Sequence, residues 1–164
     1  MSNMNSFTTA DLWDEHETLL SCVAPIFNHF GNKKVFSGII RTIKLFEDNS
    51  FVRQQLEADG QGKVLVIDGG GSLRCALIGD QLAALAIQNN WEGIIVNGCV
   101  RDSQIINSMN IGIKALNTCP AKSVKRNIGE IDIPVKFGGI TFTSEDYIYA
   151  DVDGILVSKL NLLK

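Results

Sequence analysis

The clearest hydrophobic pattern lies in the middle of the chain, where two short apolar runs flank a segment with helical spacing. Residues 63–68 (KVLVID) and 93–97 (GIIVN) are continuous apolar runs, which predict strands buried on both faces of a sheet. Between them, residues 80–90 (DQLAALAIQNN) have the period of a helix that packs on a core. Its expected core positions are Leu82, Leu85 and Ala86. This order indicates a βαβ unit with parallel strands.

Further helices and a strand are predicted around this unit. Thr8 and Asp11 have the spacing of a capping box that opens a short helix. Residues 37–46 (SGIIRTIKLF) are rich in β-branched side chains and predict a strand. Ser50 is expected to cap a helix that carries the next apolar residues and ends before Gly60. After the central unit, GCVRD is expected to be the exit loop of the second strand, and DSQIINSM is expected to be helical.

The last third of the chain changes character, because short β-like runs alternate with Gly, Asp and Ser. The runs IPVKF, GITFT, DYIYA and GILVS predict short strands of an antiparallel or mixed layer. No repeat, low-complexity tract or linker interrupts residues 1–164. The sequence therefore predicts a single α/β domain in which a βαβ core is joined to a β-rich layer.

Charge and apolar content narrow the classes of function. The net charge is -3 and the isoelectric point is near 5.3, which argues against nucleic acid as a direct partner. The densest basic cluster, AKSVKR, is interpreted as a solvated loop. No apolar run has the about 20 residues of a membrane helix, and the N-terminal segment lacks the pattern of a signal peptide. These features predict a soluble, cytoplasmic protein.

The cysteines and histidines suggest neither a disulfide framework nor a zinc site. Four cysteines are far apart in sequence and form no C-x-x-C pair, so free thiols are expected. Cys99 lies close to Arg101, but a buried packing role is favoured over a reactive one. His16 and His29 do not have the spacing of paired metal ligands.

Two loops that could carry chemistry follow the two central strands. The first, Asp68-Gly69-Gly70-Gly71-Ser72, resembles a nucleotide fingerprint but lacks its third small residue, because position 74 is Arg74. It also lacks the acidic residue that would bind a ribose after the next strand. A tight turn that lets backbones approach closely is the favoured interpretation, and a methyltransferase-like glycine turn is the weaker alternative.

The second feature combines two carboxylates with a guanidinium. Twenty residues separate Asp80 from Arg101, an interval that one helix and one strand fill, so both ends return to the same sheet edge. Asp80 and Asp102 could then hold Mg²⁺ or Mn²⁺, and Arg101 could bind a carboxylate through two hydrogen bonds. The amides of Gly79 to Leu82 would give an anion further donors at the helix start. The alternative is that Asp80 is only a helix cap and Arg101–Asp102 only a surface pair.

The Asp-x20-Arg-Asp pattern resembles the signature of the metal-dependent 4-hydroxy-4-methyl-2-oxoglutarate aldolases, which share a fold with the regulator of ribonuclease E activity A. Segments along nearly the whole chain carry the likeness, among them GKVLVIDGGGSLRCALIGDQLA, NNWEGIIVNGCVRD and YADVDGILVS. Residues 35–157 look closest to the regulator branch. The resemblance implies a swivelling β/β/α domain and a homotrimer.

The resemblance also implies roles for individual residues. Asp102 would be the direct ligand of Mg²⁺ or Mn²⁺, Asp80 would hold metal-bound water, and Arg101 would bind the carboxylate of a 2-oxo acid. Gly79, Asp80, Gln81 and Leu82 would surround the substrate. The implied activity is cleavage of 4-hydroxy-4-methyl-2-oxoglutarate to pyruvate, with oxaloacetate decarboxylation through the same pyruvate enolate. The alternatives are a non-catalytic inhibitor that binds ribonuclease E and, last, a quinone methyltransferase.

Overall fold

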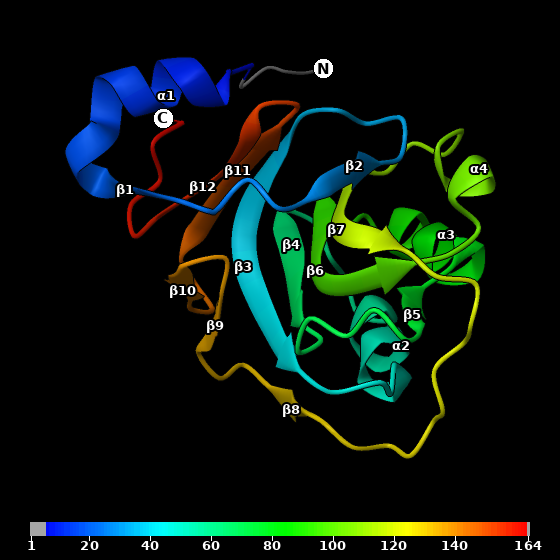
Figure 1. The fold of residues 1–164 in the computed structure, drawn as a ribbon. Helices are drawn as coiled ribbons and strands as arrows, with labels where there is room; N and C mark the ends of the chain where they lie inside the picture. Colours follow the sequence, from blue (N-terminus) through cyan, green and yellow to red (C-terminus); the bar gives the residue numbers. More distant parts are fainter. Residues whose placement is uncertain (1–5, 164) are drawn as a thin grey trace.

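A computed structural model describes residues 6–163, and most of them surround one large mixed sheet (Figure 1). The strands of this sheet are β1 (Leu20–Cys22), β2 (Asn28–Phe30), β3 (Phe36–Lys44), β4 (Lys63–Asp68), β5 (Ala76–Ile78), β6 (Gly93–Val100), β7 (Ile113–Thr118), β8 (Glu130–Ile131), β11 (Tyr147–Asp151) and β12 (Gly154–Ser158). Their order is β1-β12-β11-β3-β4-β6-β7-β2, with β5 beside β6 and β8 beside β3. Strands β3, β4, β6 and β7 run parallel, which confirms the predicted βαβ unit.

The helices are α1 (Thr9–His16), a 3₁₀ turn η1 (Glu17–Leu19), α2 (Ser50–Leu56), α3 (Asp80–Gln88) and α4 (Ser103–Ile106). The predicted cap of α1 is confirmed, because the Thr8 hydroxyl accepts a hydrogen bond from the Asp11 amide. The predicted cap of α2 is wrong by one residue, since Asn49 is the N-cap and Ser50 is already helical. Among the residues described, no helix is long and apolar enough to cross a membrane.

The two central strands are buried on both faces, as their apolar runs predict. Leu65 and Ile67 of β4 belong to a core that also contains apolar residues of α2 and α3. Val64 and Val66, which alternate with them, belong to a second core on the opposite face. A strand that contacts two cores requires apolar side chains at consecutive positions, which explains why KVLVID shows no alternation.

The strands of the last third are confirmed, but they do not form one layer. Strands β11 and β12 extend the main sheet, because β11 pairs antiparallel with both β3 and β12. Strands β9 (Val135–Phe137) and β10 (Ile140–Phe142) instead form a separate hairpin. Their side chains Val135, Phe137 and Phe142 fill the core on the sheet face opposite the helices. Hairpin, sheet and helices make the three layers of a β/β/α fold.

One boundary near the expected chemistry is wrong. The sequence pattern predicts GCV in the exit loop, but β6 continues through it to Val100. Two neighbours hold this extension, since β5 pairs with Cys99 and Val100 on one side and β7 pairs with the same residues on the other. Strand β5 follows the glycine loop closely and was not predicted. Its effect is to bring Ile78 beside Val100, so that the start of α3 lies next to Arg101.

Candidate active site

A small polar cavity of about 170 Å³ lies where β5 and β6 end and α3 begins. This volume is below the roughly 300–1,000 Å³ of sites for drug-sized ligands, so it suits a small organic acid. All predicted site residues line it: Gly79, Asp80, Gln81, Leu82, Arg101 and Asp102. The prediction that the two loops return to one sheet edge is therefore confirmed.

Asp102 connects the two loops directly. Its carboxylate oxygen Oδ2 accepts a hydrogen bond of 3.1 Å from the backbone amide of Asp80, at the first turn of α3. A carboxylate at this position is also favoured by the helix dipole. The backbone of Asp102 is left-handed, with φ of 58°, which is uncommon for a residue other than glycine. Among the described residues no donor reaches its second oxygen, Oδ1, which leaves that atom available to a ligand.

Gly79 allows this contact because it has no side chain. A Cβ atom at position 79 would lie 2.9 Å from Asp102 Oδ2 and 3.6 Å from the Arg101 side chain. The backbone of Gly79 is extended, with φ of -123°, so conformational freedom is not the reason for glycine here. The close approach of the carboxylate to the helix start is the feature that requires it.

Arg101 is held by its backbone and by one contact of its side chain. Its amide donates to Ile78 O at 2.9 Å, and its Nη1 donates to Pro120 O at 3.3 Å. Within residues 6–163 the guanidinium forms no ion pair with Asp80 or Asp102. The alternative of a surface ion pair is therefore wrong, and so is Asp80 as a cap, because Gly79 is the N-cap.

The amides at the start of α3 serve two purposes. The Asp80 amide is committed to Asp102, so the predicted set of free donors from Gly79 to Leu82 is smaller than expected. The amides of Gln81 and Leu82 belong to the first turn, where a helix offers no internal acceptor. Both residues line the cavity, so their amides are the ones that remain for an anion.

A second wall of the cavity comes from segments that were not predicted to belong to the site. Asn49, Arg53, Lys122, Ser123 and Lys125 line the cavity there. Asn49 orders this wall: its Nδ2 donates to Leu77 O at 3.0 Å, and its Oδ1 accepts from Ser123 Oγ at 2.9 Å and from Lys125 Nζ at 3.1 Å. AKSVKR is thus an exposed segment, as predicted, but part of it faces the cavity.

Asp48 holds the backbone of the AKSVKR segment and the residues that follow it. Its buried carboxylate accepts hydrogen bonds from the amide and hydroxyl of Ser50 and from the amides of Arg126 and Ile128. Burial alone would raise the pKa of Asp48, but these hydrogen bonds outweigh it and lower the pKa to about 2. Asp48 is therefore ionised at neutral pH, and it ties α2 to the segment that carries Lys122 and Lys125.

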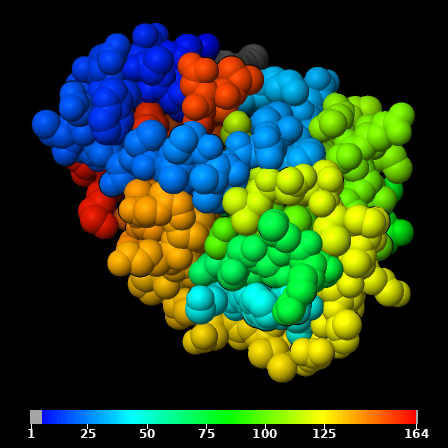
Figure 2. Space-filling view, in the orientation of Figure 1, coloured from blue at the N-terminus to red at the C-terminus, as the bar shows by residue number. Residues whose placement is uncertain are grey.

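The glycine loop is a tight turn, as the favoured interpretation predicted. Gly70 and Gly71 both have left-handed backbones, with φ of 69° and 73°. The Gly70 amide donates to Asp68 Oδ1, and the amides of Gly69 and Gly71 donate to Asn97 O. These amides are not free to bind a phosphate. Figure 2 shows the loop (green) on the surface between the segments that follow β3 (cyan) and β7 (yellow).

The cysteines near the site are free, as expected. Cys99 is fully buried in β6, and burial raises the pKa of its thiol. A raised pKa disfavours the thiolate, which is the reactive form, so the packing role of Cys99 is supported over a chemical one.

The donor set at the cavity fits a hard divalent cation. The described residues contain no group of three His, Cys, Asp or Glu side chains that could enclose a metal. Mg²⁺ does not need such a group, because it commonly binds one or two carboxylates and keeps several waters. Asp80 and Asp102 both line the cavity, and within the described chain the carboxylate of Asp80 accepts no hydrogen bond.

Comparison with known proteins gives close relatives along nearly the entire chain. A protein of Aromatoleum aromaticum named "Putative 4-hydroxy-4-methyl-2-oxoglutarate aldolase" is 55% identical over 157 residues, covering 96% of this chain and 99% of the relative. A protein of Dechloromonas aromatica with the same name is also 55% identical over 157 residues, covering 93% and 96%.

Two solved structures have the same fold. One, from Geobacillus kaustophilus and described as an S-adenosylmethionine: 2-dimethylmenaquinone methyltransferase, is 44% identical with a TM-score of 0.94, covering 96% of this chain and 98% of that one. The other, the RNA-processing inhibitor RraA from Thermus thermophilis, is 40% identical with a TM-score of 0.90, covering 94% and 93%. The relatives thus carry names of three different activities. The family model described as RraA-like: Aldolase/RraA matches residues 9–157, and this chain belongs to that family.

Proposed function

We propose that this protein is a divalent-metal-dependent pyruvate aldolase that cleaves 4-hydroxy-4-methyl-2-oxoglutarate to pyruvate, with oxaloacetate decarboxylation as a side activity. The observation that carries the proposal is the meeting of Asp80, Arg101 and Asp102 in one small polar cavity. Two carboxylates for a cation beside a guanidinium for a carboxylate are the groups that a metal-chelating 2-oxo acid needs. The aldolase names of the relatives from Aromatoleum and Dechloromonas support the same choice.

In this proposal Arg101 binds the 1-carboxylate of the substrate. Its planar guanidinium can donate two parallel hydrogen bonds, and the bond to Pro120 O engages only Nη1. The amides of Gln81 and Leu82 add donors to the same carboxylate from the first turn of α3. Together these groups orient the 2-oxo acid so that its keto oxygen lies toward Asp80 and Asp102.

Asp102 would hold the cation directly and Asp80 would hold a metal-bound water; Asp102 Oδ1 is the carboxylate oxygen that accepts no hydrogen bond from α3. When bound, Mg²⁺ or Mn²⁺ supplies Lewis-acid stabilisation of the negative charge that develops on the keto oxygen. In the cleavage step the C4 hydroxyl loses its proton and the C3–C4 bond breaks. Its electron pair forms the enolate of pyruvate, while C4 becomes the carbonyl of the second pyruvate. Asp80 is our candidate to accept the C4 hydroxyl proton through a water, and a proton returned to C3 of the enolate then gives the first pyruvate.

Oxaloacetate reaches the same enolate by a shorter route, because its C3–C4 bond breaks with loss of CO₂ and no hydroxyl proton has to be removed. One set of groups therefore serves both reactions.

We also propose that the protein assembles as a homotrimer. Static light scattering tests this assembly, and a mass near that of one 17.9 kDa chain at micromolar concentration would contradict it.

The test of the proposed activity is a lactate dehydrogenase-coupled assay for pyruvate from each substrate, first with Mg²⁺ or Mn²⁺ and then with EDTA. We expect pyruvate release that EDTA abolishes and added metal restores. Release that is unchanged by EDTA would remove the metal from the mechanism. No release from either substrate with metal present would refute the aldolase and favour a regulator that binds ribonuclease E.

A further inference from the structure

The cavity has more positive charge than the proposed chemistry uses. Its lining includes four cationic side chains and two carboxylates. Arg101 is assigned to the 1-carboxylate, and a divalent cation would offset the charges of Asp80 and Asp102. Arg53, Lys122 and Lys125, which also line the cavity, then remain without an assigned role.

Two of these three cations have no partner within residues 6–163. Lys125 Nζ is engaged with Asn49 Oδ1, but the side chains of Arg53 and Lys122 form neither a hydrogen bond nor an ion pair there. Cations that line a small cavity together repel one another, and a bound anion relieves this repulsion. The wall thus has the charge to bind a second carboxylate.

The backbones that carry these two side chains are fixed, although the side chains are exposed. Arg53 lies on α2, which Val52 and Leu56 anchor in the core. Lys122 forms a bridge with Ala76 at the start of β5, and the Ala76 amide donates to Ala121 O at 2.7 Å. The two cations therefore project from rigid elements, which limits the ordering needed when an anion binds.

We infer that Arg53 and Lys122 form the subsite for the second carboxylate, which both proposed substrates carry. The inference rests on the proposed function for the placement of the first carboxylate at Arg101. It adds two specificity-determining residues that take no part in breaking the bond. A neutral chain end would leave both cations unpaired next to an apolar group.

The test uses two non-cleavable ligands of equal length, 2-oxoglutarate and 2-oxopentanoate, which differ only by a carboxylate in place of a methyl group. Isothermal titration calorimetry with Mg²⁺ present gives the ratio of their affinities. For the wild type we expect 2-oxoglutarate to bind at least about tenfold more tightly, because charge-assisted hydrogen bonds hold its second carboxylate. In the double variant Arg53→Met with Lys122→Met, the ratio should fall to about one or two.

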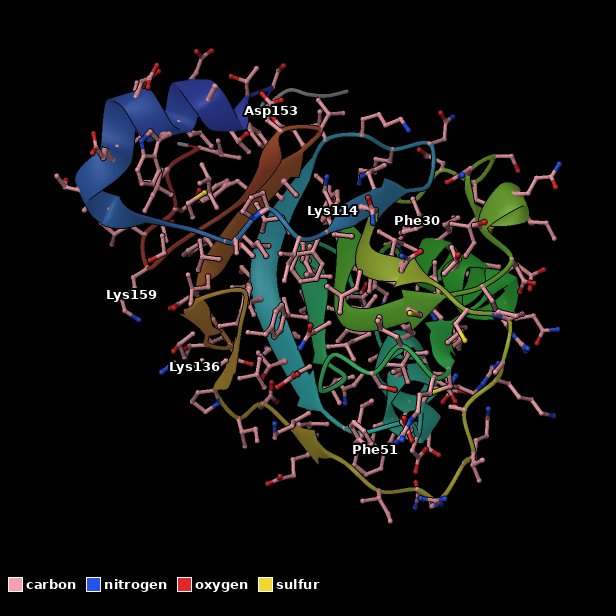
Figure 3. All side chains as sticks on the ribbon, in the orientation of Figure 1. Phe30, Phe51, Lys114, Lys136, Asp153 and Lys159 are labelled. Atoms are coloured by element: carbon pink, nitrogen blue, oxygen red, sulfur yellow. The ribbon has the colours of Figure 1, made fainter. Side chains whose placement is uncertain are left out.

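A control variant, matched in charge to Lys122→Met, removes one positive charge elsewhere. Lys136 on β9 is exposed and lies apart from α2, where Phe51 marks the helix in Figure 3. Lys136→Met should keep the wild-type ratio, which separates a local subsite from a general effect of net charge. If the double variant does not fold, Lys122→Met alone provides the comparison, with a ratio expected between the two extremes.

Equal affinities in the wild type, or an unchanged ratio in the variants, would overturn the inference. The readout is independent of turnover, so it is distinguishable from failure of the proposed function. Pyruvate release without discrimination between the two ligands would refute the subsite and leave the aldolase intact. Discrimination that depends on Arg53 and Lys122, without pyruvate release, would support the subsite and refute the aldolase.

Discussion

Replacing Gly79 by alanine tests whether the closeness of Asp102 to α3 matters. The new Cβ would lie 2.9 Å from Asp102 Oδ2, a separation that real Cβ atoms do not tolerate, so the carboxylate must move. Its hydrogen bond with the Asp80 amide, now 3.1 Å, would lengthen or break. A hydrogen bond to a charged group contributes about 1.5–3 kcal/mol, less at an exposed position. Alanine lowers the conformational entropy of the unfolded chain, and this effect offsets about 0.4–1 kcal/mol of the loss.

The net expectation is a stability loss of about 1 kcal/mol and a much larger loss of activity. A displacement of about 1 Å in a catalytic group can cost about 100-fold, so kcat/KM for pyruvate release should fall by one to two orders of magnitude. The melting temperature, measured by circular dichroism, should fall by only about 2–4 °C.

Gly139→Ala is the control for stability. Gly139 lies in the two-residue turn between β9 and β10 with φ of 79° and open space around its Cα, so alanine there costs about 1–2 kcal/mol through backbone strain alone. It should melt at least as early as Gly79→Ala and keep wild-type turnover. Full activity of Gly79→Ala, or equal activity losses in the two variants, would refute the role given to this close approach.

Two further outcomes are expected. Arg101→Lys keeps the charge but loses the planar pair of donors, so we expect kcat/KM to fall about 100-fold while Mg²⁺ affinity measured by calorimetry is retained; unchanged kinetics would contradict the assignment of the 1-carboxylate. The lowered pKa of Asp48 contributes stability that is present above pH 4 and is lost as the pH falls toward about 2, about 2 kcal/mol in total. Urea unfolding across this range should show this loss of unfolding free energy in the wild type, whereas the unfolding free energy of Asp48→Asn should depend less on pH. The same pH dependence in both proteins would refute the role of Asp48.

The sequence predicted those parts of the fold in which local pattern and tertiary role agree. KVLVID reads as a doubly buried strand because cores lie on both of its faces. The extension of β6 through Gly98 to Val100 was missed because neighbours distant in sequence create it. Strands β5 and β7 hold that extension in place, and β5 itself is only three residues long. Strands β11 and β12 were recognised, but pairing with β3 is a long-range event that no local pattern encodes.

The candidate site divides in the same way. Asp80, Arg101 and Asp102 were predictable because the interval of twenty residues matches one helix and one strand, whose ends return to one edge. The second wall was not predictable, because Asn49 and Lys122 reach the cavity from segments with no regular spacing to that motif. The capping contact from Asp102 was also missed. A cap is usually sought next to its helix, whereas this carboxylate is 22 residues beyond the amide it accepts from.

The measurement that tests the central claim most directly is pyruvate release from 4-hydroxy-4-methyl-2-oxoglutarate by wild type and Asp102→Asn across a Mg²⁺ titration. The amide is nearly isosteric with the carboxylate but lacks its charge, so the variant should bind Mg²⁺ poorly and lose turnover, with partial recovery in excess Mn²⁺. Its melting temperature without metal should stay near that of the wild type, because the side-chain amide oxygen of the variant can still accept the hydrogen bond from the Asp80 amide at this exposed position. Wild-type turnover and metal dependence in Asp102→Asn would contradict the account.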